Sequence, residues 1–218
     1  MPHISLDERK FYFPTVDEAD EEGLLLIGGK VTPARVIEAY QKGIFPWYSE
    51  EALPLWWSPD PRFVLFPAEL HISRSMQKLL SKNVFDFRID TAFEDVIHHC
   101  ATVNRKGQNG TWLTKEMKDV YIQLHHLGYA HSAETWKDGK LVGGMYGLKL
   151  GNIFFGESMF SKEPNASKLA FVKYVQHLQQ NNIQLVDCQV YTTHIESLGA
   201  KSISRQYFID ILKKEIAV

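Results

Sequence analysis

Residues 43–62, GIFPWYSEEALPLWWSPDPR, constrain the fold of this chain more than any other stretch. A proline removes a backbone donor and fixes φ, so neither a helix nor a regular strand is expected to run through a segment with four of them. Three of the chain's five tryptophans, at positions 47, 56 and 57, lie between these prolines. We therefore predict an aromatic loop that separates a small N-terminal module, residues 1–61, from a larger domain, residues 62–218.

One helix is predicted before the loop. Thr32 is a good N-cap residue, Pro33 suits the first helical position, and Gly43 lies where a helix would stop. Together with a short apolar run before it, this helix makes the N-terminal segment a small α/β module.

After the loop, strand-like and helix-like segments alternate. The runs 130–136, 140–150 and 152–160 are joined by Asp138-Gly139 and Gly151-Asn152, which favours an antiparallel meander. Further strands are predicted at 62–66 and 183–191, and helices at 71–83, 93–103, 115–128, 165–182 and 204–214. The fold class is therefore α+β, with a mixed sheet and flanking helices in a domain of roughly 150 residues.

Composition excludes several classes of protein. Two cysteines are too few for a disulfide framework, and no run approaches the ~18 apolar residues that span a bilayer. A net charge of −2 excludes a uniformly basic nucleic-acid binder. One local basic stripe is expected, because Arg74, Lys78 and Lys82 follow one another at i+4 steps on the helix 71–83. The stripe is either a phosphate-contacting surface or an ordinary solvated helix face.

Polar residues on two apolar strands are candidates for chemistry. Asp187 and Gln189 alternate with apolar neighbours, which predicts that they share one face of a buried strand. Glu157 follows Gly156 on a second buried strand. Buried polar groups must be hydrogen-bonded, so patterning alone leaves open a purely structural network. The sequence has no GxSxG, Walker-type, HExxH or GxGxxG motif.

Ten blocks of sequence occur in an order typical of one protein family. They are GIFPWYSE, LWWSPDPR, LHISRSM, GTWLT, GYAHSAETW, LVGGMYG, FFGESMFS, NASK, DCQ and SLGAKSISR. In this order they closely resemble the leucyl/phenylalanyl-tRNA-protein transferases. The resemblance runs from about Phe13 to Leu212, nearly the whole chain.

The resemblance implies a function. Members of the family transfer leucine or phenylalanine from aminoacyl-tRNA to proteins with N-terminal arginine or lysine, which creates a degradation signal. They need no cofactor or metal, and their catalytic domain resembles the acetyltransferase (GNAT) fold. We accordingly expect a cytoplasmic monomer with two partners, an aminoacyl-tRNA and an acceptor protein, and no association with membranes.

The resemblance also implies roles for particular residues. Asp187 and Gln189 would be the catalytic pair, with Asp187 polarising the Gln189 amide, and Glu157 would bind the reacting end and the cationic acceptor. The aminoacyl pocket would consist of Met145, Phe154, Tyr174, Leu178 and Val186. The tRNA would be bound by Trp47 and Trp112, which flank its terminal adenosine, and by Arg74, Lys78 and Lys82. For Trp56 and Trp57 we expect ordinary packing instead, with both residues holding the module onto the main domain.

Two other functions are alternatives to this one. An acetyl-CoA-type N-acyltransferase would carry a Q/R-x-x-G-x-G/A loop, and no glycine in this chain has Gln or Arg three residues before it. A non-enzymatic RNA-binding module would use the tryptophans and the basic stripe, but would leave Asp187, Gln189 and Glu157 without a role.

Overall fold

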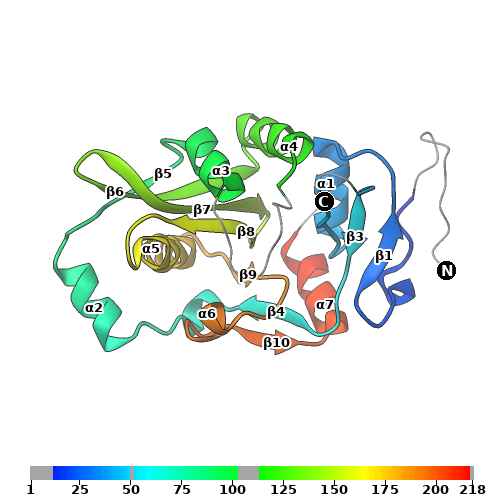
Figure 1. Cartoon of the computed structure of the whole chain (residues 1–218). Coiled ribbons are helices and arrows are strands. Elements are labelled where there is room, and N and C mark those ends of the chain that lie inside the picture. Colours follow the sequence, from blue (N-terminus) through cyan, green and yellow to red (C-terminus); the bar gives the residue numbers. More distant parts are fainter. Residues whose placement is uncertain (1–11, 50–51, 103–112, 217–218) are drawn as a thin grey trace.

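The structure is a computed structural model that describes residues 12–49, 52–102 and 113–216. It contains a three-stranded sheet in the order β1-β3-β2 and a seven-stranded sheet in the order β10-β4-β9-β8-β7-β6-β5 (Figure 1). The small sheet comprises β1 (Leu24–Ile27), β2 (Phe45–Pro46) and β3 (Leu55–Trp57). The large sheet comprises β4 (Arg62–Leu65), β5 (Asp86–Ile89), β6 (Ala130–Lys137), β7 (Lys140–Leu150), β8 (Ile153–Ser161), β9 (Leu185–Asp187) and β10 (Lys201–Ile203).

Helices flank the large sheet on both faces. Within the described residues the helices are α1 (Pro33–Gln41), α2 (Arg74–Ser81), α3 (Phe93–Thr102), α4 (Lys115–His126), α5 (Ala166–Gln180), α6 (Thr193–Glu196) and α7 (Arg205–Glu215), with short 3-10 turns η2 (Val16–Glu18) and η3 (Pro67–Glu69). Figure 1 shows α3 and α4 over one face and α5 under the other. The mixed-sheet α+β architecture and its antiparallel meander β6-β7-β8 are confirmed. No helix within the described ranges is long and apolar enough to cross a bilayer.

The prediction that no strand crosses residues 43–62 is wrong. β2 and β3 both lie there and pair antiparallel. Pro46 is tolerated because β2 is an edge strand of the small sheet, where a missing N–H breaks no ladder. Trp56 on the central strand β3 is fully buried and donates its indole N–H to Gly28 O over 3.1 Å. Trp56 also shares a buried cluster with Phe155 of the large sheet, as expected of a residue that packs the module onto the main domain.

One apolar core joins the N-terminal segment to the large sheet. Trp56 and Tyr40 belong to the same cluster of buried residues as Phe155 on β8 and Phe208 on α7. A second cluster lies on the α5 side of the sheet. α7 closes against the module, where Arg205 donates to Ser58 O over 2.7 Å.

The large sheet opens between β8 and β9, its one parallel pair. Their pairing ends at Phe155 and Asp187, although β8 continues to Ser161. On its other side, β8 pairs Gly156 with Gly147 and Ser158 with Tyr146, so Glu157 is an extra residue in a β-bulge. Bulges re-aim a side chain, and this one turns Glu157 toward the gap beside β9. Gly147 is required here, since a Cβ would lie 2.1 Å from Phe155 O.

Candidate functional site

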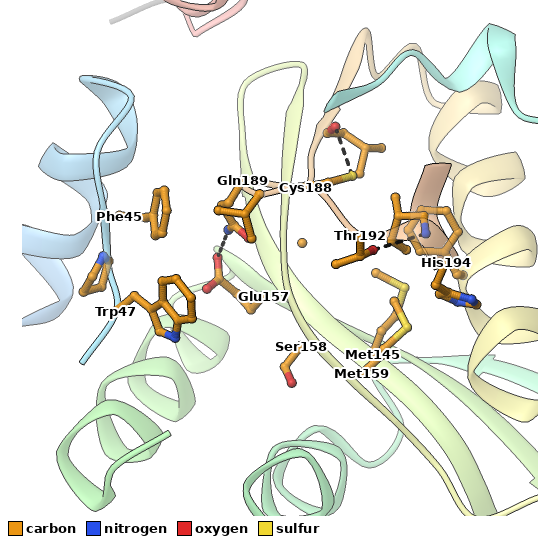
Figure 2. A pocket seen from close by; sticks show the side chains of 16 residues that line it. Phe45, Trp47, Met145, Glu157, Ser158, Met159, Cys188, Gln189, Thr192 and His194 are labelled. Atoms are coloured by element: carbon orange, nitrogen blue, oxygen red, sulfur yellow. Dashed lines mark hydrogen bonds between the residues drawn. The ribbon is translucent and has the colours of Figure 1, made fainter. Parts of the chain in front are cut away.

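A cavity of about 600 Å³ lies where β8 and β9 separate. Figure 2 shows Phe45 and Trp47 at one end, Glu157 and Gln189 in the middle, and Met145 and Met159 at the other end. The end at Met145 and Met159, here named the oily end, is lined by apolar side chains: Met145, Met159, Phe171, Val186 and Ile195. The cavity thus combines an aromatic end, a polar centre and an oily end.

Glu157 is the carboxylate at the polar centre. Its Oε1 accepts from Tyr40 Oη at 2.6 Å, and its Oε2 accepts from Tyr121 Oη at 2.8 Å. The Gln189 amide donates to Oε1 over 3.3 Å. Burial raises the pKa of Glu157 to about 7, and the two tyrosine hydrogen bonds act in the opposite direction. Glu157 can therefore change its charge near neutral pH.

The prediction that Asp187 and Gln189 share a strand face is wrong. β9 ends at Asp187, and Gln189 has a positive φ of +59°, outside the strand region. Asp187 Oδ1 accepts from the backbone N–H of Gln189 at 2.9 Å, whereas the Gln189 side chain turns to Glu157. Both residues nonetheless lie beside the cavity, and Gln189 lines it.

Arg62 is the partner of Asp187. Its Nε and Nη2 donate to the two carboxylate oxygens over 2.8 and 2.7 Å. Both side chains are buried, with 1% and 0% of their surface exposed. The two parallel hydrogen bonds satisfy both carboxylate oxygens in the interior and fix the orientation of the carboxylate.

The five predicted aminoacyl-pocket residues occupy two kinds of position. Met145 and Val186 line the cavity. Phe154, Tyr174 and Leu178 are buried in the second core cluster and are not among the residues that line it. The rings of Phe154 and Tyr174 pack edge to face, 4.9 Å apart. These three residues pack in the core behind the side chains that line the oily end.

The described residues that are predicted to bind tRNA lie in two separate places. Trp47 lies at the aromatic end of the cavity with 38% of its surface exposed. Trp112 lies outside the described residues. Arg74 and Lys78 are exposed on α2, and Lys82 is exposed just after it, on an element that contributes no residue to the cavity.

Several residues at the site were missed from the sequence. Periodicity assigns Tyr40 and Tyr121 to the buried faces of their helices, but it cannot identify the partner of a hydroxyl group. For Arg62 there is one usable signal of a role at the site. It is a charged residue at the start of β4, and all residues of this strand are buried. Such a residue requires an ionic partner.

Comparison with known proteins identifies two regions of the chain. The family model described as "Leucyl/phenylalanyl-tRNA protein transferase" matches residues 64–213, and that of its N-terminal domain matches residues 29–60. The leucyl/phenylalanyl-tRNA–protein transferase of Flavobacterium johnsoniae is 51% identical over 207 residues, 95% of this chain and 98% of that protein. The one from Syntrophus aciditrophicus is 52% identical over 204 residues, 94% and 85% of the two chains.

Solved structures give a weaker likeness. A GCN5-related N-acetyltransferase from Kribbella flavida is 8% identical, with a TM-score of 0.41 over 76% of this chain and 58% of that one.

Proposed function

The chain belongs to the leucyl/phenylalanyl-tRNA protein transferase family, and on that premise we propose that it transfers leucine or phenylalanine from aminoacyl-tRNA to N-terminal arginine or lysine of acceptor proteins. The product carries an N-terminal degradation signal. We place the reaction in the cytoplasm, where aminoacyl-tRNA is made and used, and assign it to a monomer.

The reaction needs positioning more than strong base catalysis. The α-amine of the acceptor attacks the ester carbonyl, a C–N bond forms, the ester C–O bond breaks, and the ribose hydroxyl leaves with a proton from the amine. An α-amine has a pKa of ~7.7 to 8.0, so roughly a tenth of it is neutral at pH 7. Holding amine and ester together can supply several kcal/mol of the barrier.

The main support for the proposal is the position of the hydrogen-bonded side chains of Gln189 and Glu157. They lie in one cavity between the aromatic end at Trp47 and the oily end at Met145. The terminal adenosine stacks at Trp47, and the leucyl or phenylalanyl side chain enters the oily end. The ester that joins these two parts then lies beside Gln189.

Each polar group has a role in this arrangement. The Gln189 amide uses one donor hydrogen on Glu157, and its oxygen accepts a hydrogen bond from the incoming amine. Glu157, when ionised, attracts the positive charge of the acceptor's N-terminal residue. Met145 and Met159 are flexible and polarisable, so the oily end suits both leucine and phenylalanine.

Mass spectrometry of a short peptide tests the proposed reaction. The purified protein is given leucyl-tRNA as the only donor and a peptide that starts with arginine; the control is the same peptide with an acetylated N-terminus. We expect the free peptide to gain one leucine residue at its N-terminus and the acetylated peptide to remain unchanged. If the free peptide also remains unchanged, the proposed function is wrong.

A further inference from the structure

The main chain at Gln189 has a strained conformation. Its φ is +59°, and the N–H of Val190 donates to Cys188 O over 2.7 Å, which closes a three-residue turn around it. Such turns with a positive central φ are rare. A strained residue persists only where its surroundings over-determine its conformation.

Two contacts hold the backbone of Gln189 in this turn. Its N–H donates to Asp187 Oδ1 at 2.9 Å, and its carbonyl accepts from the N–H of Phe63 at 3.3 Å. The second contact is an ordinary backbone bond to β4. The first depends on a side chain, so the orientation of the Asp187 carboxylate decides where Gln189 lies.

Arg62 fixes the Asp187 carboxylate. The guanidinium binds both oxygens, and it also lies over the rings of Phe45 and Phe208, 4.7 and 4.6 Å from their centroids. Its Nη1 donates to Gly43 O over 3.3 Å. The Arg62 side chain is thereby held by three parts of the fold at once: β2, the residues just after α1, and helix α7.

We propose that Arg62 is a positioning residue of the transfer reaction, which acts through Asp187 to hold the main chain of Gln189 and to aim the Gln189 amide into the cavity. Asp187 then serves as an acceptor for a backbone N–H, and the Gln189 side chain takes its orientation from Glu157. The inference rests on the proposed function for its activity readout, whereas its geometry can be measured without any substrate.

Arg62→Lys tests this inference. Lysine keeps the positive charge but is a single point donor that cannot make two parallel bonds to a carboxylate. We expect kcat for leucine transfer to fall by about 10²-fold, the loss typical of a misplaced reacting group, while KM for leucyl-tRNA stays within about twofold. Hydrogen exchange of the Gln189 backbone amide should speed up, while that of Cys188, which donates to Phe63 O, should not change.

Arg205→Lys is the matched control. Arg205 also joins α7 to the module, through Ser58 O, but does not contact Asp187. We expect this variant to lose some stability, measured as Tm, and to keep both kcat and the exchange rate at Gln189. If Arg62→Lys does not fold, Phe208→Leu removes one ring beside the guanidinium and should lower kcat and Gln189 protection together.

Three outcomes separate the inference from the proposed function. A folded Arg62→Lys variant with the parental kcat and Gln189 exchange rate overturns the positioning role. A Phe208→Leu variant that loses stability alone also overturns it. If the parental protein transfers no leucine, the proposed function fails, and the exchange measurement still tests whether Arg62 holds Gln189.

Discussion

The amide nitrogen of Gln189 lies 3.3 Å from Oε1 of Glu157, which joins the turn after β9 to the bulge of β8. This contact bridges the gap in the sheet at the centre of the cavity. It fixes the amide so that its remaining donor and its oxygen are available to a ligand.

Shortening Gln189 should slow transfer without weakening donor binding. Asparagine tolerates the positive φ of this position, but its amide falls short of Glu157. We expect Gln189→Asn to lower kcat by about 10²-fold, the scale of a lost catalytic hydrogen bond, with KM for leucyl-tRNA nearly unchanged. Single-turnover kinetics measure both quantities. Transfer at the parental rate would remove Gln189 from the mechanism.

The pH dependence of the transfer rate should reflect the ionisation of the Glu157 carboxyl group. Its pKa is raised to about 7, so the fraction that is ionised, and with it the attraction for a cationic acceptor, increases as pH rises through 7. Tyr40→Phe removes a hydrogen bond that lowers this pKa, so the acid limb of the rate profile should move to higher pH. The profile is measured at low acceptor concentration.

Tyr48→Phe is the control for that profile, because Tyr48 donates to Glu116 and not to Glu157. The titration of the acceptor amine is common to all variants and cannot produce a difference between them. An unchanged acid limb in Tyr40→Phe would contradict the role given to Glu157.

The sequence predicted helices and strands better than it predicted contacts between side chains. The helix capped by Thr32 and the meander β6-β7-β8 follow from local turn and cap chemistry, and both are confirmed. The turn at Gln189 does not follow from alternation, because it depends on Asp187 being held from elsewhere in the chain. Arg62 and Asp187 are 125 positions apart, and no local pattern pairs them.

The same limit applies to the cavity. The family resemblance alone implied that Phe154 lines the aminoacyl pocket, and the structure places it in the core behind the cavity. Whether a buried side chain faces a cavity or another side chain depends on how β8 and β9 separate. That separation is a property of the sheet, and hydrophobicity along one strand cannot reveal it.

Trp47 should contribute to donor binding through stacking. Base stacking on an aromatic ring is worth ~1 to 3 kcal/mol, so Trp47→Ala should raise KM for leucyl-tRNA by about 5- to 150-fold with a smaller effect on kcat. Trp47→Phe keeps a ring and should lose much less. Equal KM values for Trp47→Ala and the parental protein would show that the adenosine binds elsewhere.

The basic stripe on α2 should contact tRNA phosphates. Replacing Arg74, Lys78 and Lys82 together by glutamine should weaken tRNA binding and reduce the slope of log affinity against log salt by about 2 to 3, since each contact contributes roughly 0.7 to 0.9. Lys213→Gln/Lys214→Gln removes exposed charge from α7 instead and should leave both quantities unchanged. An unaltered slope in the triple variant would identify the stripe as an ordinary solvated helix face.

The proposed reaction requires one cavity to hold the amino-acid side chain and the terminal nucleotide of the same donor. A crystal structure with an adenosine that carries leucine through a stable amide link is the decisive measurement. We expect the leucyl side chain beside Met145 and Met159, the adenine against Trp47, and the carbonyl carbon within reach of Gln189. An analogue bound outside this cavity, or with its adenine at the oily end, would show that the donor is held in another way.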